Sequence, residues 1–208
     1  MTSDEILRIL RLTVIRKYFD DIKYALDNMP FDPILEVISA LQIARLERKT
    51  VYIFGNGGSA ATASHCACDF AKGANHKDMP GLKVVALNDN VPLMTAWAND
   101  ESYCQLYARQ LENIVEKGDV VIGISVSGNS ENVLNCVKVA HDKGALTIGF
   151  TSKIGGKLKN IVDIPVRLPV DNMEQAEDLH LLLGHVITTC LRVVSPEIPV
   201  EYSEEREL

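Results

Sequence analysis

The feature that most constrains this sequence is an alternation of short apolar runs with longer amphipathic segments, which begins after Lys49. The apolar runs predict five strands: Val51–Phe54, Lys83–Leu87, Val120–Ile124, Leu146–Phe150 and Asp163–Leu168. The amphipathic segments predict helices at Ser59–Ala71, Tyr103–Val115, Ser130–Lys143 and Met173–Val194. Apolar strands that alternate with helices are typical of a parallel sheet covered on both faces. We therefore expect an α/β fold, a three-layer sandwich around a five-stranded parallel sheet.

Two further helices are predicted ahead of the first strand. Apolar residues recur at helical spacing from Ile15 to Leu26, and a second helix is expected from Ile34 to about Arg48, with Asp32 as its N-cap. This helical pair is expected to cover the sheet or to form a subunit interface.

Length and charge suit a single globular domain. The 208 residues are predicted to form one domain over residues 1–194, which includes the helical pair at 1–48, followed by an acidic tail at 195–208. A net charge of -7 without a dense basic stripe argues against direct binding to nucleic acid or to anionic membranes.

Several features predict a cytoplasmic protein. No apolar run approaches the roughly 20 residues that a membrane helix needs, and the N-terminus does not have the pattern of a secretory signal. The five cysteines include no C-x-x-C pair, so we expect reduced thiols.

The first predicted strand runs into the glycine-rich turn Gly55-Asn56-Gly57-Gly58-Ser59, directly before a helix. Glycines let a backbone approach a ligand closely, and a helix start offers unpaired N–H groups to an anion. The turn also fits Gly55-x-Gly57-x-x-Ala60 of dinucleotide-binding folds. That interpretation expects an acidic residue about 20 positions further on, at the end of the second strand, and the fit is poor. A tight turn without a ligand is the third alternative.

The third predicted strand ends in Ser125-Val126-Ser127-Gly128-Asn129-Ser130, again directly before a helix. Three hydroxyls around a glycine at a helix N-terminus suit a phosphate monoester, because hydroxyl and backbone donors can surround its oxygens. The alternative is a serine-rich turn in which Ser130 is a simple N-cap. Two such turns at the carboxyl ends of parallel strands favour a phosphosugar pocket.

These two turns, in this order, resemble the sugar isomerase (SIS) domain. With Ala98-Asn99-Asp100, Gly118-Asp119-Val120 and Gly155-Gly156-Lys157-Leu158, the chain resembles the phosphoheptose isomerases from about residue 51 to 185. The resemblance implies a SIS-type sandwich and a phosphorylated sugar as ligand. It implies that the phosphate is held by Ser125, Ser127 and Ser130. It assigns the rest of the substrate site to Asn56, Gly57, Ser59, Asn99 and Asp100.

Histidines and carboxylates recur on two of the predicted helices. His65 and Asp69 are four residues apart, and Glu177 and His185 are eight apart, so each pair lies near one helix face. Two facing helices would bring these side chains to one point, where they could bind zinc or transfer protons. His180 lies between the last two. His76 and His141 are expected to have no role in the site.

The resemblance gives these side chains roles. Phosphoheptose isomerases carry His-x-x-x-Glu on the first of these helices and Gln-x-x-His-x-x-x-x-His on the last, which implies acid/base chemistry for Asp69 and His185. It also implies one divalent ion, zinc, held by His65, Asp69, Glu177 and His185. Two positions depart from the family: Asp69 is one methylene shorter than glutamate, and Glu177 adds a negative charge. Glu177 is therefore also a candidate for the proton-transfer base.

The resemblance implies a phosphosugar aldose–ketose isomerase, acting on sedoheptulose 7-phosphate through an enediolate. Two alternatives are an isomerase of another phosphosugar and a non-catalytic SIS protein that binds a sugar phosphate or a partner protein. A dinucleotide-dependent oxidoreductase ranks last. The family also implies a homotetramer whose sites receive residues from neighbouring subunits.

Overall fold

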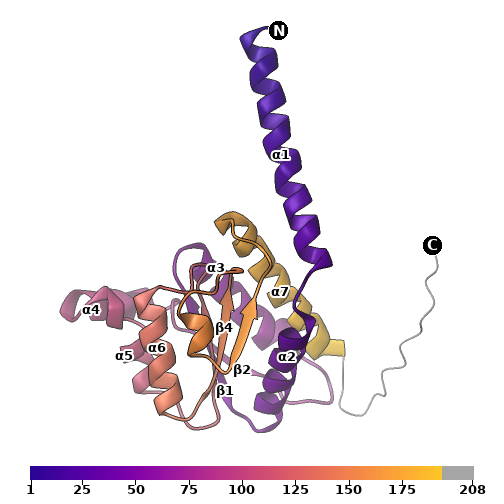
Figure 1. Cartoon of the computed structure of the whole chain (residues 1–208). Coiled ribbons are helices and arrows are strands. Elements are labelled where there is room, and N and C mark those ends of the chain that lie inside the picture. The colour runs from indigo at the N-terminus through magenta and orange to yellow at the C-terminus, as the bar shows by residue number, and fades with distance from the viewer. Residues whose placement is uncertain (194–208) are drawn as a thin grey trace.

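The structure, a computed structural model, describes residues 1–193 and has the α/β fold expected from the sequence. The predicted acidic tail, 195–208, lies outside the described residues, and the single-domain boundary remains a prediction. Figure 1 shows the sheet at the centre of the molecule with helices on both sides.

All five predicted strands are present, each within two residues of the expected bounds. They are β1 (Thr50–Gly55), β2 (Lys83–Ala86), β3 (Val120–Ile124), β4 (Leu146–Thr151) and β5 (Ile164–Arg167). Every neighbouring pair is parallel, in the order β2-β1-β3-β4-β5. After β1 the chain adds β2 on one side, and then crosses to the other side of β1 to add β3, β4 and β5 in turn. The strand order therefore reverses between β1 and β3.

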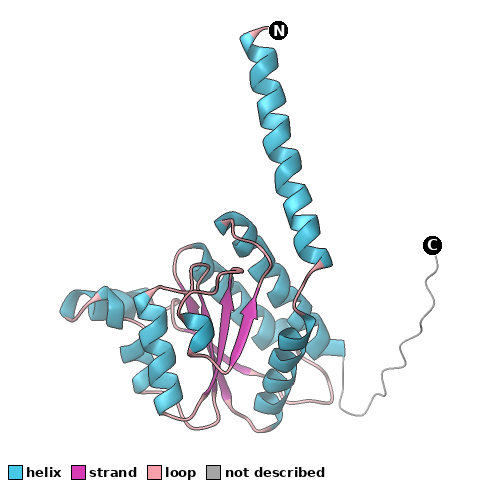
Figure 2. Cartoon of the chain, viewed as in Figure 1, coloured by secondary structure: helices cyan, strands magenta, loops and turns pink. Residues whose placement is uncertain are grey.

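Helices cover the two faces of the sheet as the three-layer prediction requires (Figure 2). The α-helices are α1 (Ser3–Asp27), α2 (Phe31–Leu46), α3 (Gly58–Cys68), α4 (Val91–Asp100), α5 (Ala108–Glu112), α6 (Glu131–Asp142) and α7 (Met173–Val193). Shorter turns are a π-helix at Asp69–Gly73 and 3-10 helices at Tyr103–Gln105 and Leu158–Asn160.

The core consists of two apolar layers, one on each side of the sheet. On one face α2, α3 and α7 contribute residues such as Leu41, Ala63 and Leu183. On the other face α5 and α6 contribute residues such as Leu111 and Val137. Alternate strand residues point into alternate layers, so the strands are apolar on both faces, as a buried parallel sheet requires.

The helix α1 projects away from the sandwich (Figure 1). It starts at Ser3, well before the predicted apolar stretch, and its N-terminus is capped by a capping box between Thr2 and Glu5. Ala25 is its one fully buried residue, whereas apolar side chains along its length, including Leu10 and Phe19, are exposed. This amount of exposed apolar surface on one helix marks a surface for contact with other molecules.

The prediction that Asp32 caps α2 is wrong. The helix begins at Phe31, after an N-cap Pro30 that makes no side-chain hydrogen bond, and Asp32 lies inside the first turn. The helix can start before Pro33 because a proline in the first turn removes an N–H that has no intrahelical partner.

The segment between β2 and β3 also differs from the prediction. α4 was not expected, and the helix predicted over Tyr103–Val115 is divided into a 3-10 turn and the short α5. The Asn90 side chain caps α4, and Pro92 lies in its first turn. None of the α4 residues is buried, so the helix lies on the outside of the sandwich.

Among residues 1–193, the structure contains no helix with the length and apolar character needed to cross a membrane.

Candidate active site

The candidate site begins where the strand order reverses, between β1 and β3. Open α/β sheets bind ligands outside the carboxyl ends of their strands at such a point. Gly55, the last residue of β1, pairs with Ile124, the last residue of β3. The two turns singled out in the sequence therefore leave the sheet side by side.

The first turn needs its glycines for close packing and for a special backbone conformation. A Cβ on Gly55 would lie 2.8 Å from the Cβ of Ser59 and 2.9 Å from the backbone oxygen of Ile124. Gly57, the N-cap of α3, has a φ of 56°, in the left-handed region that favours glycine. The buried Tyr107 hydroxyl donates to the backbone oxygen of Gly55 and holds the start of the turn.

The second turn presents the serine hydroxyls expected from the sequence. The Oγ atoms of Ser125 and Ser130 lie 3.2 Å apart. Ser130 occupies the N-cap position of α6, but its side chain makes no capping hydrogen bond. Its hydroxyl faces Ser125 instead, so the alternative of Ser130 as a simple N-cap does not describe this turn. Ser127 is exposed, and its Oγ accepts a hydrogen bond from the Asn129 N–H at 3.2 Å.

A third loop, between β4 and β5, packs against the second turn, which we call the serine turn. The Leu158 N–H donates to the Gly128 oxygen at 2.9 Å, and the Lys157 N–H donates to the Asn129 side chain at 3.1 Å. Gly128 and Gly156 both have positive φ, and a Cβ on either would overlap the backbone of the other loop. Direct contact between the two backbones fixes the shape of the serine turn.

The two turns enclose a pocket of about 160 Å³, which we call the serine pocket. Its lining is Asn56, Ser59, Ile124, Ser125, Val126, Ser127, Ser130, Met173 and Glu177. The lining includes no lysine or arginine among the described residues, so the groups it offers to an anion are hydroxyls and the N-termini of α3 and α6. The Glu177 carboxylate also lies at the α3 N-terminus, since a Cβ on Gly58 would overlap it.

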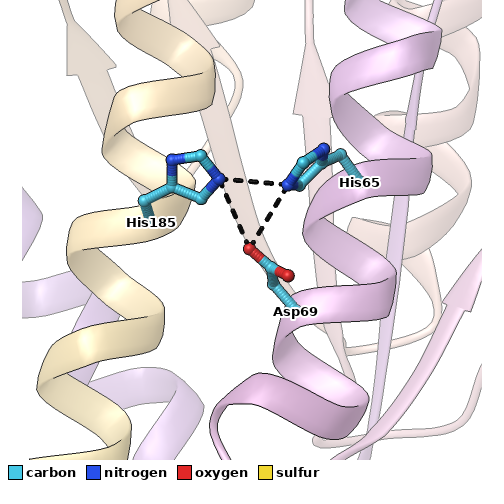
Figure 3. Close-up of side chains that lie close together, drawn as sticks. All are labelled: His65, Asp69 and His185. Atoms are coloured by element: carbon cyan, nitrogen blue, oxygen red, sulfur yellow. Dashed lines mark hydrogen bonds and ion pairs between the residues drawn. The ribbon is translucent and has the colours of Figure 1, made fainter.

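Further along α3 and α7, three side chains form a second group, which we call the histidine cluster (Figure 3). The Nε2 atoms of His65 and His185 lie 3.0 Å apart, and each lies 3.5 Å from Asp69 Oδ2. The side chains of His65, Asp69 and His185 are 48%, 27% and 52% exposed, so the cluster is open on one side.

Small residues and a local π-turn bring the two helices close enough for this contact. α3 packs against α7, and a Cβ on Gly184 would overlap the Cys66 sulfur, so glycine is needed there. Asp69 begins the π-turn, in which the Ala74 N–H donates to the Asp69 oxygen at 2.8 Å. Single π-turns of this kind are frequent at functional sites.

Glu177 does not join the histidine cluster. It precedes His185 by eight residues, which corresponds to about 12 Å along the axis of α7. The prediction that both lie on one face is confirmed, since Glu177 lines the serine pocket beside α3 and His185 meets His65 on α3. Within one chain, the structure brings together three of the four predicted metal ligands.

The donor set of the cluster fits a divalent ion such as zinc. The ligand atoms of His65, Asp69 and His185 all lie within 4.8 Å of one another. Tetrahedral zinc with Zn–N bonds of about 2.05 Å holds two nitrogens roughly 3.3 Å apart, a few tenths of an ångström more than the distance seen here. Three protein ligands with one open side are the pattern of catalytic zinc sites.

Asn99 and Asp100 do not reach the serine pocket of their own chain. They are the last two residues of α4, both are exposed, and the Asn99 side chain donates to Asp100 at 2.9 Å. Neither lines the serine pocket.

His180 belongs to neither group. It lies on α7 between Glu177 and His185, is fully buried, and stacks on Phe150 with ring centroids 6.1 Å apart. Burial lowers its pKa to about 4, and a weak contact with the Thr151 backbone opposes this shift. The ring is therefore a neutral core group at ordinary pH.

Of the two remaining histidines, His141 borders a larger hollow of about 550 Å³ that also includes Lys138 and Asp163. This hollow lies at the amino end of β5, away from the edge of the sheet where both turns emerge. His76 faces Asp78 at 3.9 Å in the loop after the π-turn. Neither lies in the serine pocket or the histidine cluster of its own chain.

Two side chains near the serine pocket were not singled out in the sequence. The buried Asn132 and the exposed Tyr103 both hydrogen-bond to Asn56. Asn132 is separated from Asn56 by 76 positions, and no local pattern indicates the contact. The one signal available was the position of Asn132 in the first turn of a predicted helix, where asparagine commonly bonds to backbone groups.

The chain is similar in sequence and in structure to proteins named phosphoheptose isomerase. The chain matches the SIS domain family over residues 17–152. It is 39% identical over 166 residues to the phosphoheptose isomerase of Thermodesulfovibrio yellowstonii, covering 80% of this chain and 82% of that protein. It is 36% identical over 179 residues to the phosphoheptose isomerase of Aquifex aeolicus, covering 85% and 93%. The structure of phosphoheptose isomerase GmhA from Neisseria gonorrhoeae matches with a TM-score of 0.81 at 27% identity, over 90% of this chain and 100% of that one.

Proposed function

The chain belongs to the phosphoheptose isomerase family of SIS-domain proteins, and from this premise we propose that it is an aldose–ketose isomerase of sedoheptulose 7-phosphate. The observation that carries this proposal is the arrangement of two groups along the same pair of helices. The serine pocket lies at the start of α3 and α7, and the histidine cluster lies about two turns further along both. An extended sugar with a terminal phosphate has the shape to span the two.

In the proposed reaction the serine pocket holds the phosphate and carboxylate or imidazole groups move the proton. A base takes the proton from C1 of the ketose, and the electron pair forms a C1–C2 double bond while charge develops on O2. The proton is then delivered to C2, the carbonyl forms at C1, and a hydroxyl proton passes from O1 to O2. Candidates for this transfer are His185 with Asp69 or Glu177.

Glu177 is the alternative base, and this role requires a different pose of the substrate. Its carboxylate lines the serine pocket, where the phosphate on C7 would lie, so only a curled sugar chain would bring C1 and C2 back to it. Asp69 is held between two imidazoles in the histidine cluster, which suits a metal ligand better than a free base.

The histidine cluster is proposed to hold one divalent ion, zinc being the first candidate. His65, Asp69 and His185 would be its ligands, whereas Glu177, the fourth ligand implied by the resemblance, lies about 12 Å further back along the axis of α7. A bound ion supplies Lewis-acid stabilisation of the oxygens on which charge develops. Metal analysis of the purified protein, before and after a chelator, tests this assignment, and loss of the ion from a His65→Ala variant is the expected result.

We further propose a homotetramer in which neighbouring subunits complete each site. The exposed apolar surface of α1 and the exposed α4 support this assembly. Asn99 and Asp100, which do not line the serine pocket of their own chain, would reach a neighbour's pocket. Light scattering on the full chain measures the mass, and a monomer at micromolar concentration would contradict the proposal.

We place the reaction in the cytoplasm. All five cysteines are unpaired in the structure. Free thiols are typical of proteins in reducing compartments.

A non-catalytic sugar-phosphate-binding protein is the second candidate. It is favoured by the two departures from the family pattern, Asp69 and Glu177, because the first shortens a carboxylate and the second adds charge to the phosphate pocket. Turnover separates the two candidates. The test is conversion of sedoheptulose 7-phosphate by the full chain, with and without added zinc, followed by NMR. Appearance of the aldose supports the isomerase, and binding without any product supports the second candidate.

A further inference from the structure

We propose that Asn132 and Tyr103 are positioning residues that orient the amide of Asn56 toward the substrate. Asn56 lines the serine pocket, whereas Asn132 lies behind it, only 2% exposed. The proposal rests on the function proposed above insofar as the ligand is a sugar phosphate, and it adds two residues that act through a third.

The two asparagines form a reciprocal amide pair. Asn56 Nδ2 donates to Asn132 Oδ1 at 2.9 Å, and Asn132 Nδ2 donates to Asn56 Oδ1 at 2.8 Å. The pair links the glycine-rich turn after β1 to the first turn of α6, which follows the serine turn. The two turns that line the serine pocket are therefore linked by a side-chain hydrogen-bond pair as well as by the pairing of β1 with β3.

A backbone group fixes the orientation of this pair. The Val133 N–H donates to Asn132 Oδ1 at 3.0 Å. Because a backbone N–H can only donate, the oxygen of Asn132 must face it, and the Asn132 NH₂ must then face the oxygen of Asn56. The Val133 N–H, which has no intrahelical partner at the α6 N-terminus, thus fixes the orientation of the Asn132 amide. Asn132 in turn fixes the orientation of the Asn56 amide.

Tyr103 supports the same orientation from the other side. Its hydroxyl donates to Asn56 Oδ1 at 3.0 Å. The turn that carries Tyr103 is held on α6, because the Asn135 side chain donates to the Cys104 oxygen at 3.2 Å and Cys104 Sγ donates to Glu131 at 3.1 Å. The position of Tyr103 is therefore set by α6 as well.

The result is a directed hydrogen-bond donor in the pocket. Asn56 Oδ1 accepts two hydrogen bonds, and one N–H of Asn56 is used by Asn132. Its second N–H has no partner among residues 1–193, and the side chain lines the same pocket as Ser125 and Ser130. This N–H is available to an oxygen of the bound sugar phosphate, and a rotated amide would present an acceptor instead.

The test is a double-mutant cycle on binding. Asn132→Asp keeps the shape and the acceptor for Val133 but removes the donor to Asn56 and places two oxygens face to face. Calorimetry with sedoheptulose 7-phosphate is expected to show affinity about tenfold weaker, and less than about twofold weaker when the chain already carries Asn56→Ala. Lys138→Gln makes the same change in net charge further along α6, at an exposed side chain that touches neither Asn56 nor the Tyr103 turn, and is expected to change affinity less than about threefold.

Tyr103→Phe provides a second route, because Tyr103 is 57% exposed and its replacement leaves the core intact. It is expected to weaken binding about threefold, again only when Asn56 is present, and in turnover to raise KM while kcat changes less than about twofold.

Equal losses of affinity in the wild-type background and in the Asn56→Ala background would show a charge or folding effect and overturn the proposal. Unchanged affinity in both single variants, Asn132→Asp and Tyr103→Phe, would overturn it as well. Since binding is measured directly, a wild-type chain that binds the sugar phosphate without turning it over would remove the proposed isomerase function and leave this test valid. A wild-type chain that binds neither the sugar phosphate nor inorganic phosphate would overturn the positioning role.

Discussion

The serine pocket and the histidine cluster differ in how the fold builds them. Ser59 and Ser125 are 5% and 4% exposed, and backbone contacts between three loops shape their surroundings. The imidazoles of His65 and His185 are about half exposed and meet only where α3 and α7 touch. The serine pocket is thus set by strand topology, whereas the histidine cluster is set by the contact of two helices and is left open on one side.

This difference separates binding from chemistry along one pair of helices. Changes in the serine pocket should act mainly on KM, and changes in the histidine cluster mainly on kcat. Glu177 is the exception, because it lies in the serine pocket but carries a group able to move a proton.

The largest effect is expected for the histidine cluster. His185→Ala removes a group placed for proton transfer and metal binding, and should lower kcat about a thousandfold with little change in thermal stability. The assay is NMR of substrate conversion. His141→Ala, on the exposed far end of the sandwich, is the matched control and should behave as wild type. Unchanged turnover in His185→Ala would contradict the assigned role of the cluster.

Glu177→Gln tests whether the two regions are chemically distinct. Glutamine keeps the size of the side chain but cannot accept the proton, so kcat should fall about a hundredfold. KM should not rise, since one negative charge leaves the phosphate pocket. Metal content is measured in parallel in Glu177→Ala and should match wild type. Loss of the metal there would mean that Glu177 belongs to the metal site after all.

Ser125→Ala tests the binding region alone. Removal of one hydroxyl that bonds to a charged phosphate should raise KM about thirtyfold, with kcat within about threefold. Steady-state kinetics with the phosphorylated sugar measures both parameters. Ser39→Ala, which removes an exposed hydroxyl on α2, is the control. A fall in kcat without a change in KM would show that the phosphate is bound elsewhere.

The smallest effect concerns His180, which lies on α7 between the two regions. Its pKa in the folded chain is about 4, below the ordinary value of 6.5, so the unfolded state binds the proton first as pH falls. Its contribution to stability is retained above pH 6.5 and is lost as the pH falls toward 4. Between about pH 6.5 and about pH 5.5 wild type should lose about 1 kcal/mol more than His180→Leu in denaturant unfolding. An identical pH slope in both proteins would show that His180 is not the buried neutral group described here.

Much of the fold followed from sequence patterns, because each strand is a continuous apolar run and each turn carries glycine or serine where the backbone needs it. The missed helix α4 had its own signals, Asn90 as N-cap and Pro92 in the first turn, but none of its residues is fully buried, and only Met94 and Trp97 pack partly against the core. The capping box of Thr2 and Glu5 likewise marked the start of α1.

The site was predictable in its parts and less so in their assembly. Spacing correctly placed His65 beside Asp69, and Glu177 on the same helix face as His185. Two side chains on one helix face need not belong to one site, however, because a separation of eight residues places them about 12 Å apart along the helix axis. Contacts between distant segments, such as that of Asn132 with Asn56, depend on tertiary packing and leave no periodic trace in the sequence.

The most direct test of the central claim is proton exchange at the reacting carbon. The full chain is incubated with sedoheptulose 7-phosphate in heavy water with zinc supplied, and NMR follows both the product and the carbon beside the carbonyl. The account predicts that the aldose appears and that deuterium enters at that carbon, and that both depend on His185. A folded, sugar-phosphate-binding chain that yields neither product nor deuterium incorporation would contradict enediolate chemistry at this site.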